Sequence, residues 1–440
     1  MGSECSLGQN TAGQSRAAGE EGVFFCIDMK TFYASVECAQ RGLNPFETDL
    51  VVADLTRGKN ALCLAISPKM KARGVKNRCR LSDIPAGIKY HVAPPRMQLY
   101  IEYAADIYAL YLNYFAPEDI HVYSIDEAFI DVTGYLGIYR KTPEELARQL
   151  MDEIAQKLHI PSTVGIGTNL YLAKIALDIT AKKAKDHMGY LDERRYREML
   201  WDHKPITDFW QIAGGTARRL EKYGITTMRG VAACPEELLY RTFGINAELL
   251  IDHAWGRESC RMCDIKSYKV KSRSVSFSQI LPRNYNYEQA KTVLIEMAYH
   301  GCRELMRRKV IAKTVWVGIS YAKGWHPSTA ASVRVFSATA LPSKLKPAAE
   351  EAFIKAAAVD VPIRRLAICF GDVCDEGCEG YDLFTDWGCA EREKAREKAL
   401  LQITDKYGKN AVLRGVNYLE GATQRERNQM IGGHRAGYDD

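Results

Sequence analysis

The sequence has no long hydrophobic run. No apolar segment approaches the ~20 residues that a membrane-spanning helix needs, and residues 1–22 lack the apolar core of a signal peptide. We therefore expect a cytoplasmic protein that does not enter the membrane. A disulfide framework is also missing, because the thirteen cysteines are an odd number scattered through 440 residues. Cys260 and Cys263 have no second pair at the spacing of a zinc finger.

What the chain does have is a strongly basic stretch. Between Lys266 and Arg334 there are thirteen Lys or Arg and three Glu, in a chain whose net charge is +6. On a single helix such an excess would be typical of a solvated face, but here it spans predicted strands as well as a helix. The pattern favours a nucleic acid partner, since each phosphate contact releases condensed counterions.

Two adjacent acids interrupt a segment that otherwise favours β-structure. Residues 122–125 and 128–132 are rich in β-branched and aromatic residues and predict two short strands, with Asp126 and Glu127 at the turn between them. Two carboxylates about 4 Å apart repel by roughly 4 kcal/mol at an effective dielectric constant of 20, so a fold that holds them together usually recruits a cation. An exposed polar hairpin tip is the alternative.

A third acid follows another predicted strand. Residues 23–27 are continuously apolar, as in a strand buried on both faces, and Asp28 comes directly after them. Residues 29–37, which follow, have the spacing of a helix. If Asp28 faces Asp126 and Glu127, the three carboxylates would form a site for two divalent cations, of the kind that catalyses phosphoryl transfer.

Both segments together resemble a known family. Residues 28–37, with the sequence DMKTFYASVE, and residues 124–131, with the sequence SIDEAFID, are similar to the two catalytic motifs of Y-family DNA polymerases, the DinB and UmuC group. That family copies damaged templates. The resemblance covers roughly residues 23–372 and implies a multidomain α+β fold with a polymerase palm, small fingers, a helical helix-hairpin-helix thumb and a βαββαβ little-finger domain.

The resemblance also implies an order of domains. We expect a disordered leader at 1–21, palm at 22–32 and 97–195, fingers at 33–96, thumb at 196–260, a linker at 261–271, little finger at 272–372 and a C-terminal tail at 373–440. In the little finger, helices are predicted at 287–308 and 347–359. A charged helix is predicted at 391–407, followed by a flexible end.

Three carboxylates hold the catalytic metal in the family. The resemblance implies that Asp28, Asp126 and Glu127 bind two Mg²⁺ ions, with the Met29 carbonyl as a further ligand. Mg²⁺ prefers hard oxygen ligands and keeps waters and substrate phosphates in its remaining positions. Catalysis would then consist of positioning and charge neutralisation.

Basic residues are expected at the triphosphate of the incoming deoxynucleotide (dNTP). Lys71 occupies the family's position in the fingers, within a helix that Ser67 would cap. Pro68 stands where many members carry an aromatic residue, and Arg57 or Lys59 could supply the contact instead.

A palm lysine is expected at the same triphosphate. In the family this lysine follows an alanine. Lys182 matches the position if Thr180 is a one-residue insertion, and Lys183 is the alternative.

Two regions are expected to contact primer-template DNA. Residues 209–225 resemble a helix-hairpin-helix, in which a glycine turn directs backbone amides at a phosphate; Gly214 and Gly215 occupy that turn, and a plain helical turn is the alternative. In the basic stretch the predicted phosphate contacts are Lys269, Lys271, Arg273 and Arg334.

A short segment near the end resembles a peptide that binds the sliding clamp. Residues 380–384, GYDLF, partly match the peptides by which bacterial polymerases dock on the clamp, with Leu383 and Phe384 as the pocket anchors. The leading Gln of such peptides is missing.

The sequence therefore predicts a template-directed DNA polymerase for translesion synthesis and DNA repair. A palm-type nucleotidyl cyclase could use the same carboxylates, but the hairpin-helix and basic regions would then have no function. A catalytically silent DNA-binding accessory protein is the other alternative, and the intact Asp28, Asp126 and Glu127 argue against it.

The resemblance also implies that Tyr33 lies beneath the incoming sugar as a steric gate, with Phe32 packed beside it. A core aromatic residue on an amphipathic helix is the alternative for Tyr33. We predict that Tyr33→Ala raises the incorporation of ribonucleotides relative to deoxyribonucleotides, because the ring no longer collides with a 2′-hydroxyl. Primer extension with each nucleotide type measures the ratio, and unchanged sugar discrimination would contradict the assignment.

Overall fold

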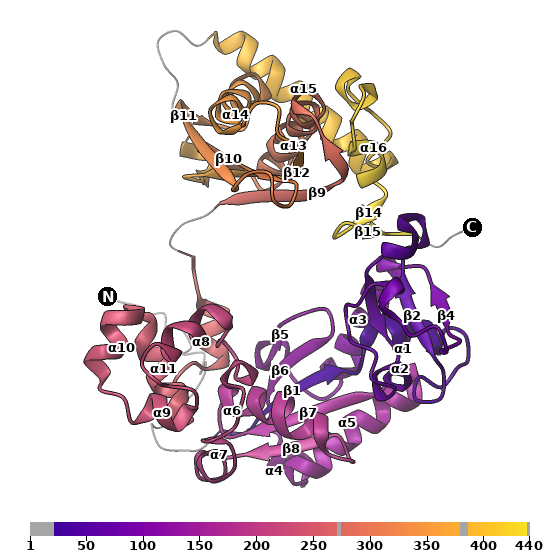
Figure 1. Ribbon diagram of the computed structural model, residues 1–440, viewed down its shortest axis with the longest axis vertical. Coiled ribbons are helices and arrows are strands. Elements are labelled where there is room, and N and C mark those ends of the chain that lie inside the picture. The colour runs from indigo at the N-terminus through magenta and orange to yellow at the C-terminus, as the bar shows by residue number, and fades with distance from the viewer. Residues whose placement is uncertain (1–21, 271–273, 379–385, 438–440) are drawn as a thin grey trace, which may run out of the picture. The chain divides into compact units, whose positions relative to one another are not determined.

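The structure is a computed structural model that describes residues 22–270, 274–378 and 386–437 (Figure 1). The expected leader at 1–21 lies outside these ranges. The chain forms two compact units, the first of residues up to Pro95 together with Leu99–Tyr268, the second of Arg96–Gln98 together with residues from Lys269 onward. In the part of the chain that the structure describes, no helix is both long and apolar enough to cross a bilayer.

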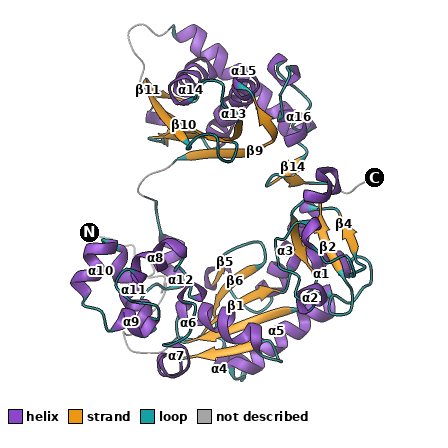
Figure 2. Cartoon of the chain, viewed as in Figure 1, coloured by secondary structure: helices purple, strands orange, loops and turns teal. Residues whose placement is uncertain are grey.

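A five-stranded sheet forms the centre of the first unit (Figure 2). Its strand order is β5-β6-β1-β7-β8, with bounds Ile120–Val122, Glu127–Asp131, Phe24–Met29, Ser162–Gly167 and Met188–Leu191. The central strand β1 is buried as its apolar sequence predicts, and it runs antiparallel to both β6 and β7. The predicted hairpin is confirmed, although β5 ends at Val122, earlier than expected, so that residues 123–126 form the connection.

Helices connect the strands of this sheet. They are α1 Phe32–Ala39, α3 Met97–Leu112, α4 Leu136–Tyr139, α5 Pro143–Leu158 and α6 Leu170–Ile175. Helices α5 and α6 contact β7, whereas α1 contacts a smaller sheet at residues 50–53 and 63–66. Helix α5 begins where local signals dictate, because Thr142 and Glu145 form a capping box at its N-terminus. Helix α6 lies close to β7 because Gly165 and Gly167 have no side chain; a Cβ on either would lie 2.1 Å from a backbone atom of Ala173.

A smaller sheet and a short helix form another part of the first unit. The strand order is β3-β2-β4, with bounds Cys63–Ile66, Leu50–Ala53 and His91–Ala93, and helix α2 spans Pro68–Ala72. The predicted start of α2 is confirmed, since the Ser67 hydroxyl accepts a hydrogen bond from the Met70 N–H and Pro68 is the first helical residue. Gly74 follows the helix with a φ of +83°, a conformation that favours glycine at a helix end.

The remainder of the first unit is helical. The helices are α7 Glu193–Leu200, α8 Gly214–Glu221, α9 Met228–Ala232, α10 Glu236–Phe243, α11 Asn246–Trp255 and α12 Met262–Ser267. Helices α7 to α11 share a core in which Leu220, Met228, Leu239 and Ala247 are buried. Helix α12 lies where a linker was expected at 261–271, because Met262 is buried against Phe24 and Cys26 of β1.

The second unit contains the βαββαβ order that the sequence predicts. Its elements are β9 Val275–Tyr285, α13 Tyr287–Arg307, β10 Val310–Tyr321, β11 Thr329–Thr339, α14 Pro342–Ala356 and β12 Ile363–Gly371, and the sheet order is β11-β10-β12-β9. Residues of both helices, among them Val293, Met297 and Phe353, share one core with one face of the sheet. Helix α14 begins at Pro342, earlier than the predicted residue 347, because Pro342 itself occupies the favoured first position.

A C-terminal segment packs on helix α13 of the same unit. It contains α15 Trp387–Tyr407, α16 Gln424–Arg427 and the two-stranded β14 Met430–Ile431 and β15 His434–Arg435. The expectation of a flexible end is therefore wrong for residues 408–437, and the contacts of Glu296 show why. This α13 carboxylate is 2% exposed and accepts hydrogen bonds from the backbone N–H groups of Thr423 and Gln424 at 2.7 and 3.1 Å and from the Asn417 amide at 2.8 Å.

We predict that Glu296→Gln lowers the free energy of unfolding by about 2 kcal/mol. The side-chain NH₂ group of the glutamine would face N–H groups that donate to the Glu296 carboxylate in the parent chain. Urea denaturation measures the loss. Glu351→Gln, on the exposed side of α14, is the matched control and should stay within about 0.5 kcal/mol of the parent. Equal denaturation midpoints for both variants would contradict a stabilising role of the Glu296 contacts.

Candidate active site

Strand pairing brings the two acidic motifs together. Strands β1 and β6 are adjacent and antiparallel, and their register pairs Asp28 with Glu127. The Met29 N–H donates a hydrogen bond to the Asp126 carbonyl at 2.9 Å, which closes the end of this ladder. Directly paired residues in antiparallel strands project side chains on the same face with Cα atoms about 4.5–5.5 Å apart. The structure thus brings Asp28, Asp126 and Glu127 to one end of the central sheet.

The carboxyl groups in this cluster affect one another. Burial, opposed by Lys182 and reinforced by Asp126 and Glu127, raises the pKa of Asp28 to about 7. A carboxyl group with such a pKa is ionised at neutral pH only in part. A bound cation would favour the ionised form, so the donor chemistry fits a hard divalent ion.

Each carboxylate also has a partner from the chain itself. Glu127 accepts from the Lys174 ammonium at 2.8 Å and from the Cys26 thiol at 3.2 Å, and Asp126 accepts from the Ser124 hydroxyl at 2.6 Å. Across the described ranges, no three His, Cys, Asp or Glu side chains converge closely enough to hold an ion. The carboxylates expected to bind metal are therefore close in the fold, but those of Asp126 and Glu127 accept hydrogen bonds from protein donors.

Lys174 is a buried cation that the sequence analysis missed. Its ammonium lies 2.8 Å from Glu127 and 3.0 Å from Asp178. Burial opposes its charge, but the surrounding acidic groups, Cys26, Asp178 and Glu127, outweigh it and raise the Lys174 pKa. The only sequence signal was its place on the first helical turns after β7, so tertiary packing was needed to identify it.

Lys182 lies where a one-residue insertion would place it. Residues Ala176–Thr180 form a π-helical segment, and a π-bulge is how a helix accommodates one extra residue. Lys182, which follows this segment, lies 3.9 Å from Asp28 and 2.7 Å from Asp178. This geometry favours Lys182 over Lys183 as the residue at the carboxylate cluster.

The ring of Tyr33 packs against a buried tyrosine. Its ring stacks on Tyr100 with centroids 4.5 Å apart and planes at 16°, and the Tyr100 hydroxyl donates to the buried Glu37 carboxylate at 2.7 Å. Burial and the neighbouring Asp126 carboxylate raise the pKa of Tyr33, so its hydroxyl is neutral. Phe32 is 2% exposed and lies beside it, with ring centroids 5.8 Å apart.

Helix α2 presents Lys71 without a competing acid. Lys69 and Arg73 both pair with Asp49, at 3.3 and 3.4 Å, whereas Lys71 forms no ion pair within the residues that the structure describes. The alternative Arg57 pairs with Asp54 at 3.5 Å.

A second residue missed from the sequence is Lys30. It lies two positions after Asp28, in the turn that follows β1. Its ammonium lies 3.0 Å from His187 Nδ1, and it makes no ion pair with a carboxylate in the described part of the chain. Burial lowers the pKa of Lys30, and the nearby Lys71 and Lys182 add to the effect. The ammonium groups of Lys30, Lys174 and Lys182 thus lie near Asp28.

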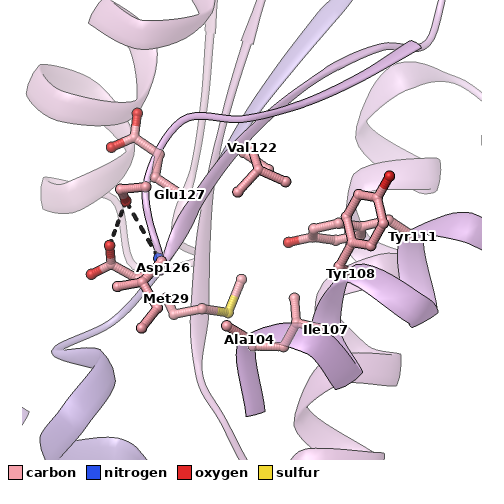
Figure 3. Close-up of a pocket in the computed structure, with 11 residues that line it drawn as sticks. Met29, Ala104, Ile107, Tyr108, Tyr111, Val122, Asp126 and Glu127 are labelled. Atoms are coloured by element: carbon pink, nitrogen blue, oxygen red, sulfur yellow. Dashed lines mark hydrogen bonds between the residues drawn. The ribbon is translucent and has the colours of Figure 1, made fainter. Parts of the chain in front are cut away.

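A small apolar pocket lies beside the acidic turn. Figure 3 shows Met29, Ala104, Ile107 and Tyr108 around it, with Asp126 at its border. Ser124 and Glu127 are also among its lining residues, so the pocket adjoins the carboxylate cluster on the side of helix α3.

The structure describes some of the residues that are expected to contact DNA. Gly214 and Gly215 begin α8, whose N-terminus has no side-chain cap. Lys269 and Arg334 are exposed. Two other predicted DNA contacts, Lys271 and Arg273, lie outside the described residues. The same holds for the predicted clamp anchors Leu383 and Phe384.

Comparison with known proteins assigns the family. Residues 27–178 match the impB/mucB/samB family, and residues 272–383 match the impB/mucB/samB family C-terminal domain. The chain is 31% identical over 422 residues to UvrX of Bacillus subtilis (strain 168), a UV-damage repair protein by name, covering 93% of this chain and 97% of UvrX. It is 28% identical over 424 residues to DNA polymerase IV 2 of the same organism, covering 94% and 99% of the two chains.

A solved structure supports the fold. A Y-family DNA polymerase chimera of Dbh and Dpo4 matches with a TM-score of 0.62 and 21% identity, over 80% of this chain and 99% of the chimera. The chain belongs to the impB/mucB/samB family, and thus to the DinB and UmuC group of Y-family DNA polymerases. Membership confirms the predicted multidomain α+β fold and the polymerase class that acts in repair of damaged DNA. It also implies dependence on divalent metal ions.

The pKa of Asp28 predicts how metal affinity depends on pH. A protonated carboxyl group does not bind a cation well, so affinity should fall as the pH drops through about 7. Between about pH 8 and about pH 6 the dissociation constant for Mn²⁺ should rise about tenfold if one proton competes with the ion. Isothermal titration calorimetry measures it. An affinity that stays constant over this range would contradict the raised pKa.

Proposed function

We propose that this chain extends a DNA primer by transferring a nucleotide from a dNTP to the primer 3′-hydroxyl, under direction of a template, in translesion synthesis. The observation that carries the proposal is the register of β1 and β6, which places Asp28 opposite Glu127 in a chain that aligns with its relatives over nearly their full length. A soluble, cytoplasmic protein would meet its DNA and nucleotide substrates directly.

Two Mg²⁺ ions would be held by Asp28, Asp126 and Glu127, with the Met29 carbonyl as a further ligand. When bound, Mg²⁺ would stabilise the negative charge of the phosphoryl transfer. The Lys174 ammonium neutralises Glu127, and the Ser124 hydroxyl donates a hydrogen bond to Asp126. They keep the carboxylates ordered at the end of the sheet.

The triphosphate would be bound by cations from three elements. Lys182 follows the π-helical segment, Lys71 projects from α2, and Lys30 comes from the turn after β1. The N–H groups at the start of α1 add donors, since the cap residue Thr31 makes no side-chain capping bond. Because Lys30 and Lys182 are partly desolvated, a phosphate group would relieve the repulsion between neighbouring ammonium groups.

The sugar would be selected by Tyr33. A steric gate must resist displacement, and the stack on Tyr100, itself held by Glu37, supplies that resistance. Phe32 is part of the core and would act by fixing the start of α1.

Gly214 and Gly215 would contact a DNA phosphate through their amides. A Cβ at either position would meet no atom within 4 Å, so the packing of the protein does not require glycine there. Close approach of an external group would require it. The remaining proposed phosphate contacts are Lys269, Lys271, Arg273 and Arg334, and Leu383 and Phe384 would dock on the sliding clamp.

Primer extension with purified protein and Mg²⁺ tests the proposal. We predict that Asp126→Asn lowers the rate by about a hundredfold or more, since several kcal/mol of charge stabilisation would be lost. Asp152→Asn, an exposed carboxylate on α5, is the control and should keep the parent rate. A cyclic product made without primer would indicate a nucleotidyl cyclase instead, and DNA binding without extension by the parent chain would indicate an accessory protein.

A further inference from the structure

The Asp126 carboxylate is oriented by a hydrogen bond from within its own hairpin. It accepts from the Ser124 hydroxyl at 2.6 Å, and Ser124 lies in the connection between β5 and β6, residues 123–126. The N–H groups of Tyr123 and Ser124 donate to the Glu127 carbonyl at 2.9 and 3.0 Å, so these bonds tie the hairpin to itself. The Met29 N–H holds the Asp126 backbone, but the position of the Ser124 hydroxyl depends on the connection.

Trp210 contacts this connection from the helical part of the first unit. Its indole N–H donates to the Tyr123 hydroxyl at 3.1 Å, and the two rings meet edge to face with centroids 6.0 Å apart. Trp210 also packs on Phe129 of β6, again with centroids 6.0 Å apart, and Phe129 meets the Tyr123 ring at 5.6 Å. The Lys174 ammonium, which pairs with Glu127, lies 5.9 Å from the centre of the Tyr123 ring. Such aromatic contacts add to the stability that burial alone supplies.

Trp210 is itself held by the helices behind it. His253 of α11 stacks on its ring with planes at 20° and on Tyr171 of α6 with centroids 3.9 Å apart. His253 is 3% exposed, and its Nε2 lies 3.0 Å from the Glu258 carboxylate. Trp210 therefore offers Tyr123 a well-anchored surface.

The pocket beside α3 gives the connection room to move. Val122, Ser124 and Ile125 line it, and Figure 3 shows Val122 at its edge. Tyr123 is 47% exposed, so burial does little to fix its ring. The contact with Trp210 restrains the connection where the pocket does not.

We propose that Tyr123 and Trp210 are positioning residues for Asp126. Trp210 fixes the Tyr123 ring, Tyr123 fixes the adjoining Ser124, and the Ser124 hydroxyl orients the Asp126 carboxylate. In a phosphoryl transfer, a misplacement of a reacting group by about 1 Å can cost about a hundredfold in rate. The pair thus acts on the rate of the reaction and not on the affinity for nucleotide.

This inference rests on the proposed function, because that function places Asp126 at the reacting phosphate. It adds a restraint that the register of β1 and β6 does not supply. The register aligns the backbones of the two strands, whereas the contact between Tyr123 and Trp210 joins side chains 87 positions apart and acts on the connection beyond the paired residues.

Single-nucleotide incorporation by the full chain with Mg²⁺ and a primer-template tests the pair. Tyr123→Phe removes the hydroxyl group that accepts the indole N–H, so the maximal rate should fall about fivefold. The dNTP concentration at half-maximal rate should change by less than about twofold. Trp210→Phe should lower the maximal rate about tenfold, because ring area on Phe129 is lost as well. The double variant should fall no further than Trp210→Phe, since both changes remove the same hydrogen bond.

A measurement without turnover separates this inference from the proposed function. Isothermal titration calorimetry with Mn²⁺ alone should show about threefold weaker binding for Tyr123→Phe than for the parent chain, since residues around a metal ligand tune its affinity. If the parent chain extends no primer while this difference in affinity is found, the proposed function fails and the positioning role stands. Equal Mn²⁺ affinities would overturn the positioning role whether or not the parent chain is active.

Trp255→Phe and Tyr240→Phe are the matched controls. Trp255 is a half-buried tryptophan of α11 whose ring contacts Trp201, and Tyr240 is an exposed tyrosine of α10. Both variants should keep the parent rate and Mn²⁺ affinity, and the urea denaturation midpoint of Tyr123→Phe should match that of the parent, because the substituted ring is half-exposed.

Four results in the incorporation assay would overturn the proposal. They are a parent-like rate for Tyr123→Phe, an equal loss for Trp255→Phe, a loss in the double variant that equals the product of the two single losses, and a raised half-saturating dNTP concentration at an unchanged maximal rate. The last result would place Tyr123 in nucleotide binding instead.

Discussion

The register between β1 and β6 is the constraint on which the candidate active site depends. It joins segments about a hundred residues apart and fixes Asp28 opposite Glu127. A shift of one residue would turn one of these two side chains to the other face of the sheet. The Met29 N–H bond to the Asp126 carbonyl at 2.9 Å extends the same alignment beyond the paired residues. Backbone pairing therefore positions the charges of the candidate site.

Keeping acids together requires counter-charges, and the fold supplies them from one helical region. Lys174 lies before the π-helical segment and Lys182 after it, and both pair with Asp178. The extra residue of this segment turns the second lysine toward Asp28. Asp178 thus links two cations, one directed at Glu127 and the other at Asp28.

Much of the fold could be predicted from the sequence because its signals are local. The capping box of α5, the Ser67 cap of α2 and the apolar run of β1 each depend on a few neighbouring residues. The placement of Asp28 beside Asp126 and Glu127 followed from the motifs that the sequence shares with its family. Lys30 and His187 could not be paired in this way, since 157 positions separate them. The contact of Glu296 with Thr423 spans 127 positions and depends equally on tertiary packing.

That last contact has a consequence for synthesis of the chain. Helix α13 leaves the ribosome long before Asn417, Thr423 and Gln424 do, and until then the carboxylate of Glu296 must stay in water or be buried without donors. The second unit can therefore complete its packing only when almost the whole polypeptide has emerged. A chain cut short by a late nonsense codon would retain every residue of the polymerase motifs and still contain a destabilised second unit, which cellular proteases would recognise.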